Sequence, residues 1–403
     1  MRKFIIIWFG QLISMIGSAM TWFALTIWAW EETGKASALS TIAFFAFLPS
    51  VLFSPIAGAF VDRWNRRRDR RLVIALSDFA TALGTLVILL IFTLGELQIW
   101  HIYLVSILAG FFTAFQYPAF IAAVTSLVEK RDYARAEGML GSARALSGIL
   151  APIFAAGLLG FAGLRGIMLI DLATFIAALA TLWMVRIPPP EDTQTGLRSR
   201  GTLVQEIRFG FNYIREDRSL SALTILFMLA GIFIAMGSTL IAPLVLGGTS
   251  NNESALASVQ ATGAVGGVVG GALLSLWGGT KRRIHNVLIG GAGACLLGIV
   301  WLGAGTGVLV WAIGGFFFAF FEPFVEGGNL AIWQERVPPD VQGRVLSARH
   351  LLVQLPYLMG ILMAGYLAES VTVSLVLILA GLAGTITFAA GYLFQSVRGA
   401  NDG

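Results

Sequence analysis

The sequence predicts an all-α membrane protein with twelve transmembrane helices. Of its 403 residues, 57% are apolar and only 12% are charged, and the mean hydropathy is +0.81. A soluble domain is nearer half apolar and a quarter charged, so this chain has too few polar side chains for a water-facing surface of its size. Its apolar residues also come in continuous runs about as long as a membrane-crossing helix, without the alternation of membrane strands.

The predicted spans divide into two sets of six. The first set is Phe4–Trp30, Ala36–Val61, Leu72–Leu94, Ile99–Val128, Ala134–Ala162 and Gly166–Ile187. The second set is Leu220–Leu246, Ser254–Trp277, Val287–Thr306, Val308–Trp333, Val345–Ala368 and Thr372–Val397. A very short turn is expected between the ninth and tenth spans.

The basic residues gather on one side of the predicted helices. Nearly all Lys and Arg residues in loops lie in the connections after spans 2, 4, 6, 8 and 10, whereas the opposite side holds only Lys35 and Arg165. Short cytoplasmic loops carry the excess of Lys and Arg in membrane proteins. We therefore expect the protein in the cell membrane with both termini in the cytoplasm. The same distribution accounts for the net charge of +5 without a nucleic-acid partner.

Several function classes are disfavoured by what the sequence lacks. Its single cysteine, Cys295, and three scattered histidines offer no disulfide and no metal-ligand spacing. No Ser nucleophile stands beside a base, so an enzyme is not expected. There is no G-x4-G-K-[ST] loop for ATP, and we expect no cofactor and an ion gradient as the energy source.

The chain contains an internal repeat at an offset of 205 residues. The segment from Gly110 to Pro118 resembles that from Gly315 to Pro323, and Ser142-Ala143-Arg144 matches Ser347-Ala348-Arg349 in the same register. Six helices per half predict a parallel repeat. The expected domains are a six-helix bundle over 1–187, a cytoplasmic linker over 188–219 and a second bundle over 220–403. The end of the linker is either a surface amphipathic helix or a plain tether.

The loop after the second span carries a specific motif. It reads Gly58-Ala59-Phe60-Val61-Asp62-Arg63-Trp64-Asn65-Arg66-Arg67. This resembles the G-x-x-x-D-R-x-G-R-R/K signature of the major facilitator superfamily, with Asn65 in place of its second Gly, which is a mild change at a left-handed turn. The resemblance covers nearly the whole chain and implies a cytoplasmic latch at Gly58, Asp62, Arg63, Asn65, Arg66 and Arg67. The alternative is simple positive-inside charge.

Two further motifs narrow the resemblance. The fifth span is similar to the antiporter motif G-x8-G-x3-G-P-x2-G-G, with small residues replacing most glycines, at Gly138, Ser147, Ala151, Pro152, Ala155 and Ala156. Ordinary small-residue packing is the alternative. Together with Asp171-Leu172-Ala173-Thr174-Phe175 and Val337-Pro338-Pro339, the chain resembles the macrolide-efflux branch, which also holds siderophore exporters.

Charged residues inside a membrane are costly and indicate function. The candidates for proton coupling are Glu322, Glu326, Asp171 and Asp78. The resemblance implies a substrate cavity, and the residues expected to line it are Gln11, Trp22, Gln116, Tyr117 and Asn329. The repeat-matched Arg144 and Arg349 are gate candidates.

Each of these side chains also has a structural interpretation. Glu326 could form an ion pair with Arg349 or Arg144. Asp171 could cap a helix or pair near Arg165. Asp78 could bond to neighbouring backbone or to residues of the latch motif. The two arginines could extend to the lipid headgroups.

The preferred hypothesis is a monomeric secondary transporter that exports amphipathic, macrolide-like molecules in exchange for protons, by alternating access within membrane lipid. An uptake permease or uniporter for a metabolite or lipid is the alternative. A non-transporting membrane sensor is the remote one.

Overall fold

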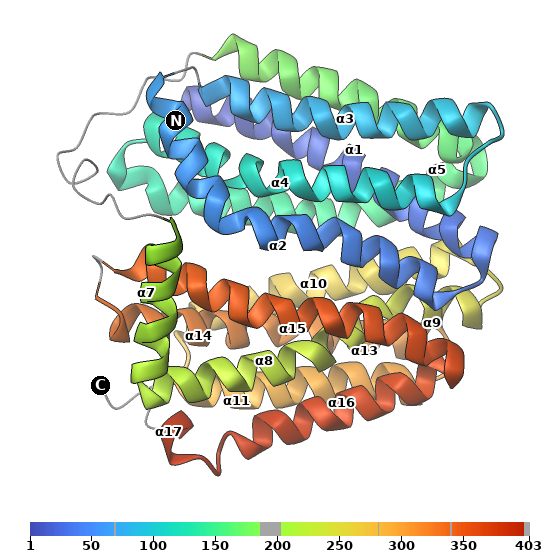
Figure 1. Ribbon diagram of the computed structural model, residues 1–403. Coiled ribbons are helices and arrows are strands. Elements are labelled where there is room, and N and C mark those ends of the chain that lie inside the picture. Colours follow the sequence, from blue (N-terminus) through green and yellow to red (C-terminus); the bar gives the residue numbers. More distant parts are fainter. Residues whose placement is uncertain (68–69, 186–202, 281, 339–340, 399–403) are drawn as a thin grey trace. The chain divides into compact units, whose positions relative to one another are not determined.

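A computed structural model describes residues 1–67, 70–185, 203–280, 282–338 and 341–398, leaving aside the side chains of residues 58–67, 70–71 and some further positions. All the regular secondary structure in these ranges is helical (Figure 1). The first four helices are α1 (Arg2–Thr33), α2 (Ala36–Arg67), α3 (Arg70–Thr93) and α4 (Ile99–Leu127). Each of them contains the corresponding predicted span to within a residue at its ends, because uninterrupted apolar runs fix both their position and their length.

The fifth predicted span, and the sixth as far as Met184, fall in α5 (Tyr133–Met184), which consists of two helices that meet at a kink. Gly163 interrupts it with a φ of 63° and a ψ of −176°, a conformation that a residue with a side chain rarely adopts. Among the described residues, eleven helices are long and apolar enough to cross a membrane, and one of them, Arg135–Met184, has 50 residues. Since about 20 residues suffice for a crossing, that element holds two spans and the total is twelve.

The second half contains more interruptions than the sequence predicts. Its helices are α7 (Leu203–Glu216), α8 (Arg218–Thr239), α9 (Ile241–Gly248), α10 (Glu253–Trp277), α11 (Arg283–Gly293), α12 (Trp301–Ala304), α13 (Val308–Phe320), α14 (Glu322–Arg336), α15 (Gln342–Ser370), α16 (Val373–Ala390) and α17 (Gln395–Arg398). A π-helical turn, η2 (Ala294–Val300), joins α11 to α12. The tenth predicted span breaks at Phe321, directly before Glu322 and Pro323, and this proline stands in the first turn of α14, where its missing N–H costs no helical hydrogen bond.

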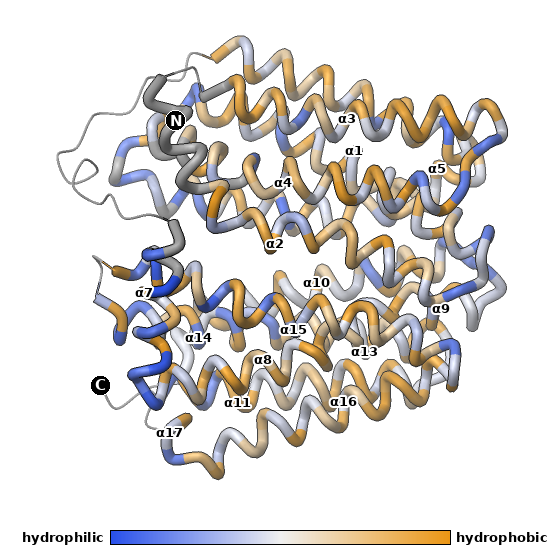
Figure 2. Tube along the Cα trace, viewed as in Figure 1, coloured by the Kyte–Doolittle hydropathy of each residue, from blue (hydrophilic) through white to orange (hydrophobic). Residues whose placement is uncertain are grey.

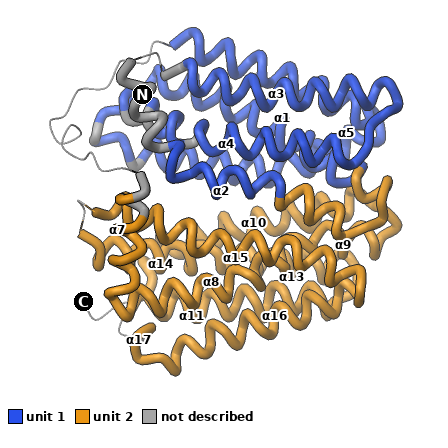
Figure 3. Tube along the Cα trace, viewed as in Figure 1, with its two compact units in different colours: residues 1–28, 45–203 blue, residues 29–44, 204–403 orange. Residues whose placement is uncertain are grey.

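By its contacts the chain forms two compact units (Figure 3). Unit 1 comprises Met1–Trp28 and Phe45–Leu203, and unit 2 comprises Ala29–Phe44 and Val204–Gly403. This grouping differs from the expected boundaries at 187 and 219 because Ala29–Phe44 makes its contacts within unit 2. There, the Trp30 indole donates to Asn251 Oδ1 at 2.9 Å, and Glu369 Oε1 accepts from the Ser37 amide at 3.2 Å.

Helix α7 belongs to unit 2 and packs through its apolar residues. Ile214 is 4% exposed, and a Cβ at Gly210 would collide with the carbonyl of Arg344 and with Ala348 at the start of α15. Tyr213 and Asp217 also contact Arg336, whose guanidinium forms a 3.2 Å ion pair with the carboxylate of Asp217. The end of the expected linker is therefore a helix packed on its own unit.

Hydrophobic residues occur along the lengths of the helices (Figure 2), and many of their large apolar side chains are exposed. Phe161 is 91% exposed, Leu276 88% and Leu309 75%. Soluble monomers rarely expose such surface over a wide area, whereas lipid would cover it. The chain is thus a multi-pass membrane protein.

Candidate functional site

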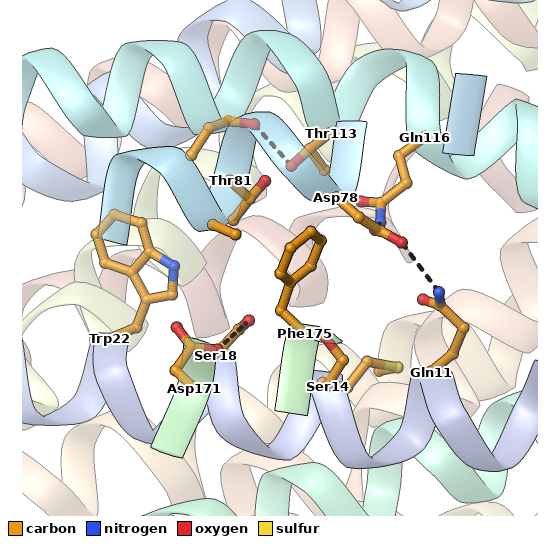
Figure 4. A pocket seen from close by; sticks show the side chains of 13 residues that line it. Gln11, Ser14, Ser18, Trp22, Asp78, Thr81, Thr113, Gln116, Asp171 and Phe175 are labelled. Carbon is orange, nitrogen blue, oxygen red and sulfur yellow. Dashed lines mark hydrogen bonds between the residues drawn. The ribbon is translucent and has the colours of Figure 1, made fainter. Parts of the chain in front are cut away.

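Unit 1 contains a partly open cavity of about 200 Å³ that is lined largely by residues with polar side chains (Figure 4). Four helices line it, and no lining residue comes from unit 2. Its lining residues are Gln11, Ser14, Met15, Ser18 and Trp22 from α1, Asp78, Thr81 and Ala82 from α3, Ala109, Thr113 and Gln116 from α4, and Asp171 and Phe175 from α5.

The contribution of α1 follows from helical periodicity. Residues 11, 14, 15, 18 and 22 recur at intervals of three and four, so they lie along one face of the helix. Two glycines let this helix approach the second half of α5. A Cβ at Gly10 would collide with Thr181, and one at Gly17 would collide with Thr174 Oγ1 and lie 3.2 Å from the Cα of Asp171. The absence of a side chain at Gly17 thereby brings Ser18 within reach of Asp171.

Asp78 is held by amide groups from two other helices. Its side chain is 8% exposed, and Gln11 Nε2 donates to its Oδ2 at 3.1 Å. Gln116 Nε2 donates to its Oδ1. Asp78 therefore links α3 to α1 and α4, whereas the expected contact with the latch motif falls on side chains outside the described residues.

Asp171 is held by hydroxyl groups. Its side chain is 4% exposed, Ser18 Oγ donates to its Oδ1 at 2.9 Å, and Thr85 Oγ1 donates to its Oδ2 at 3.1 Å. A role as a partner of Arg165 is not supported, because Arg165 is exposed and the carboxylate is bonded to α1 and α3 instead. Both oxygens of both carboxylates thus accept a hydrogen bond.

The two carboxylates stand at separate ends of the cavity. In Figure 4, Asp171 lies beside Ser18 and Trp22, and Asp78 lies beside Gln11 and the amide of Gln116. On α1, their partners Gln11 and Ser18 are seven residues apart. On α3, Asp78 itself and Thr85, which bonds to Asp171, are also seven residues apart. At 1.5 Å per residue the separation is about 10 Å, too long for a shared proton.

Charge and size limit what the cavity can hold. None of its thirteen lining residues is Lys, Arg or His, so two ionised carboxylates would give it a charge of −2 without a basic partner. Drug-sized ligands occupy pockets of about 300–1,000 Å³, whereas a cavity of this volume has room for several water molecules. The site therefore favours protons or another small cation over a bulky substrate.

The membrane acids of unit 2 have different surroundings. Glu322 begins α14 after the break at Phe321, Glu326 lies one turn further on, and both side chains are exposed. Tyr357, which shares a 3.3 Å hydrogen bond with Ser238, lies near enough to Glu322 for electrostatic interaction. Glu326 interacts in the same way with Arg349.

Next to these acids lies a buried polar cluster. Asn329 is 0% exposed and its Oδ1 accepts from the Trp333 indole at 3.1 Å. The guanidinium of Arg349 lies 5.3 Å from the Trp333 ring centroid and 5.7 Å from that of Phe227. Asn329 is thus a core residue here rather than part of an open cavity. Arg144, which the repeat matches to Arg349, is exposed.

The small residues of the antiporter-like motif are packed, with one exception. Ala151, Pro152, Ala155 and Ala156 are buried, and Ser147 Oγ donates to the carbonyl of Met15 at 3.2 Å, at the cavity wall. Gly138 is exposed, and a Cβ there would meet nothing within 4 Å. The side chains of Tyr117 and of the latch motif (Gly58, Asp62, Arg63, Asn65, Arg66 and Arg67) lie outside the described residues.

Three polar residues of the site were not singled out from the sequence. Thr81 and Thr113 line the cavity, and Thr85 bonds to Asp171. Single threonines in apolar helices carry little signal, since they commonly bond to their own helix, as Thr81 does to the carbonyl of Ser77. A usable signal is the repeated seven-residue spacing of polar residues on α1 and α3.

The fold and this buried polar cavity define a multi-pass membrane protein of the transporter class. The model of the Major Facilitator Superfamily matches residues 7–361, and the chain belongs to that family, whose members are transporters and not enzymes.

Relatives support the same assignment. Macrolide efflux protein A of Streptococcus pyogenes is 28% identical over 384 residues, which cover 94% of this chain and 92% of that protein. Macrolide efflux protein A of Enterococcus faecalis is 28% identical over 333 residues, covering 81% of this chain and all of that protein. A crystal structure of a POT family transporter in complex with 5-aminolevulinic acid has the same fold, with a TM-score of 0.74, 14% identity and coverage of 98% of this chain and 96% of that one.

Proposed function

We propose that this transporter exports amphipathic, macrolide-like molecules from the cell in exchange for protons. The relatives named macrolide efflux proteins support the substrate class, and the cavity of unit 1 supports the coupling. In this proposal the protein lies in the cell membrane with both termini in the cytoplasm. It works as a monomer by alternating access, with the latch and antiporter-like motifs at its moving contacts.

The observation that carries the coupling proposal is the pair of buried acids, Asp78 and Asp171. A transporter driven by a proton gradient needs a group that can hold a proton away from bulk water and release it later. Both side chains are less than a tenth exposed, yet both face a cavity large enough for water. The exposed acids Glu322 and Glu326 remain the second candidates for this role.

The test is uptake of radiolabelled erythromycin, a macrolide, into inverted membrane vesicles with an imposed pH gradient. We expect gradient-driven uptake by the native chain and its loss in the double variant Asp78→Asn/Asp171→Asn. Asp132→Asn is the matched control, because it makes the same chemical change at a half-exposed carboxylate outside the cavity.

The outcome separates the alternatives. Unchanged gradient-driven uptake in the double variant would remove the coupling role from the cavity. Uptake in right-side-out vesicles that runs down the proton gradient would indicate a permease. Erythromycin that raises the thermal stability of the protein without any flux would favour a sensor.

A further inference from the structure

The two carboxylates of the unit 1 cavity differ in the chemistry of the groups that hold them. Asp78 accepts from the side-chain amides of Gln11 and Gln116. Asp171 accepts from the hydroxyls of Ser18 and Thr85. An amide nitrogen can only donate a hydrogen bond, whereas a hydroxyl can donate or accept.

This difference decides which carboxylate can be protonated at low cost. A protonated acid has an O–H that needs an acceptor. At Asp78 both oxygens face NH₂ groups, so a proton on either one would oppose a donor until an amide turned over. These two donors, unlike the burial of the side chain, favour the ionised form of Asp78.

At Asp171 a rotation of one hydroxyl is enough. When a proton binds Oδ1 or Oδ2, the hydroxyl oxygen of Ser18 or Thr85 can accept a hydrogen bond from it. The same hydroxyls can therefore bond to the neutral and to the ionised form of Asp171, which an amide nitrogen cannot do.

Among the described residues that line the cavity, none competes with the two carboxylates as a proton site. From α1, α3, α4 and α5, the residues that line the cavity include only Asp78 and Asp171 as titratable groups. The hydroxyl of Thr174 donates to the backbone carbonyl of Asp171 and not to its carboxylate. Water that enters the cavity therefore meets one carboxylate fixed by donors and one whose partners adapt.

We propose that Asp171 is the residue that takes up and releases the transported proton, and that Asp78 stays ionised and joins α1 and α4 to α3. This assignment rests on the proposed proton coupling. In the loading step a hydronium ion in the cavity gives its proton to a carboxylate oxygen of Asp171, which forms one O–H bond and leaves water. The release step is the reverse, and the charge of the cavity alternates between −2 and −1.

The test is infrared difference spectroscopy of the full chain in detergent, between mildly alkaline and mildly acidic pH, which needs no substrate. We expect a band of a protonated carboxylic acid that is lost in Asp171→Asn and retained in Asp78→Asn. Asp171→Ser, which offers a hydroxyl to the same partners, serves if the Asn variant does not accumulate. The exposed Glu96→Gln is the control and keeps the band.

Two results would overturn the assignment: loss of the band in Asp78→Asn with its retention in Asp171→Asn, or a band that neither variant changes. The failure of the proposed function looks different. In that case the band still disappears in Asp171→Asn, but erythromycin uptake by the native chain does not respond to a pH gradient.

Discussion

In unit 1, Asp78 and Asp171 are 8% and 4% exposed and each accepts two hydrogen bonds, whereas Glu322 and Glu326 of unit 2 have exposed side chains. The difference shows that a position within a membrane span does not by itself decide how far a carboxylate is buried or which groups bond to it. Burial makes the charged form expensive, and the partners then decide which form persists. Among these four acids, Asp78 and Asp171 combine burial, specific partners and a cavity.

The largest loss of stability is expected from a change that disturbs the close packing of α1 against Asp171. Gly17→Ala should destabilise the protein by about 1–3 kcal/mol, because the added Cβ collides with Thr174 Oγ1 and crowds the Asp171 backbone. Gly138→Ala is the control on α5, since a Cβ there meets nothing within 4 Å. Thermal unfolding in detergent measures both, and equal melting temperatures for the two variants would contradict the close approach.

A smaller effect is expected from removal of the acid that joins three helices. Asp78→Ala should cost about 1–2 kcal/mol, because it breaks two hydrogen bonds within the membrane and leaves the amides of Gln11 and Gln116 unpaired. Glu326→Ala, on an exposed side chain, should change stability by less than about 0.5 kcal/mol. Chemical unfolding of both variants tests the contrast, which is lost if Glu326→Ala costs as much.

The smallest effect concerns the charged cluster of unit 2. The guanidinium of Arg349 lies over the rings of Trp333 and Phe227, an interaction worth about 0.5–1 kcal/mol. A double-mutant cycle of Arg349→Ala and Phe227→Leu should return a coupling energy in that range. Strictly additive effects would show that the Phe227 ring does not stabilise the guanidinium. The prediction that Arg349 is a gate residue would then stand without this structural role.

The fold was predictable because the solvent imposes it. Apolar runs of about 20 residues have one favourable structure in lipid, so the spans from the sequence agree with the helices of the structure. The breaks at Phe321 and at η2 were not predicted. Both breaks depend on tertiary packing. The break at Phe321 also involves Pro323, although the repeat-related Pro118 lies inside the uninterrupted helix α4.

The site was predictable in its residues but not in its grouping. Gln11, Trp22, Gln116, Asp78 and Asp171 were all singled out, yet the first three were assigned to a substrate cavity and the acids were considered separately. One sequence does not show which faces of α1, α3, α4 and α5 meet, because that depends on close approaches such as the one at Gly17. The two hydroxyls on Asp171 follow from the same approach.

The central claim is that unit 1, through Asp171, carries the coupled proton. It is tested most directly by the erythromycin concentration ratio that vesicles reach under a proton-motive force of about 100 mV, where one proton contributes about 2.3 kcal/mol. Loss of that proton lowers the ratio roughly 40-fold, because each 1.4 kcal/mol is about tenfold. We predict this loss in Asp171→Asn and a near-native ratio in Glu322→Gln/Glu326→Gln. A native ratio in Asp171→Asn, with the loss in the glutamate variant, would contradict the account.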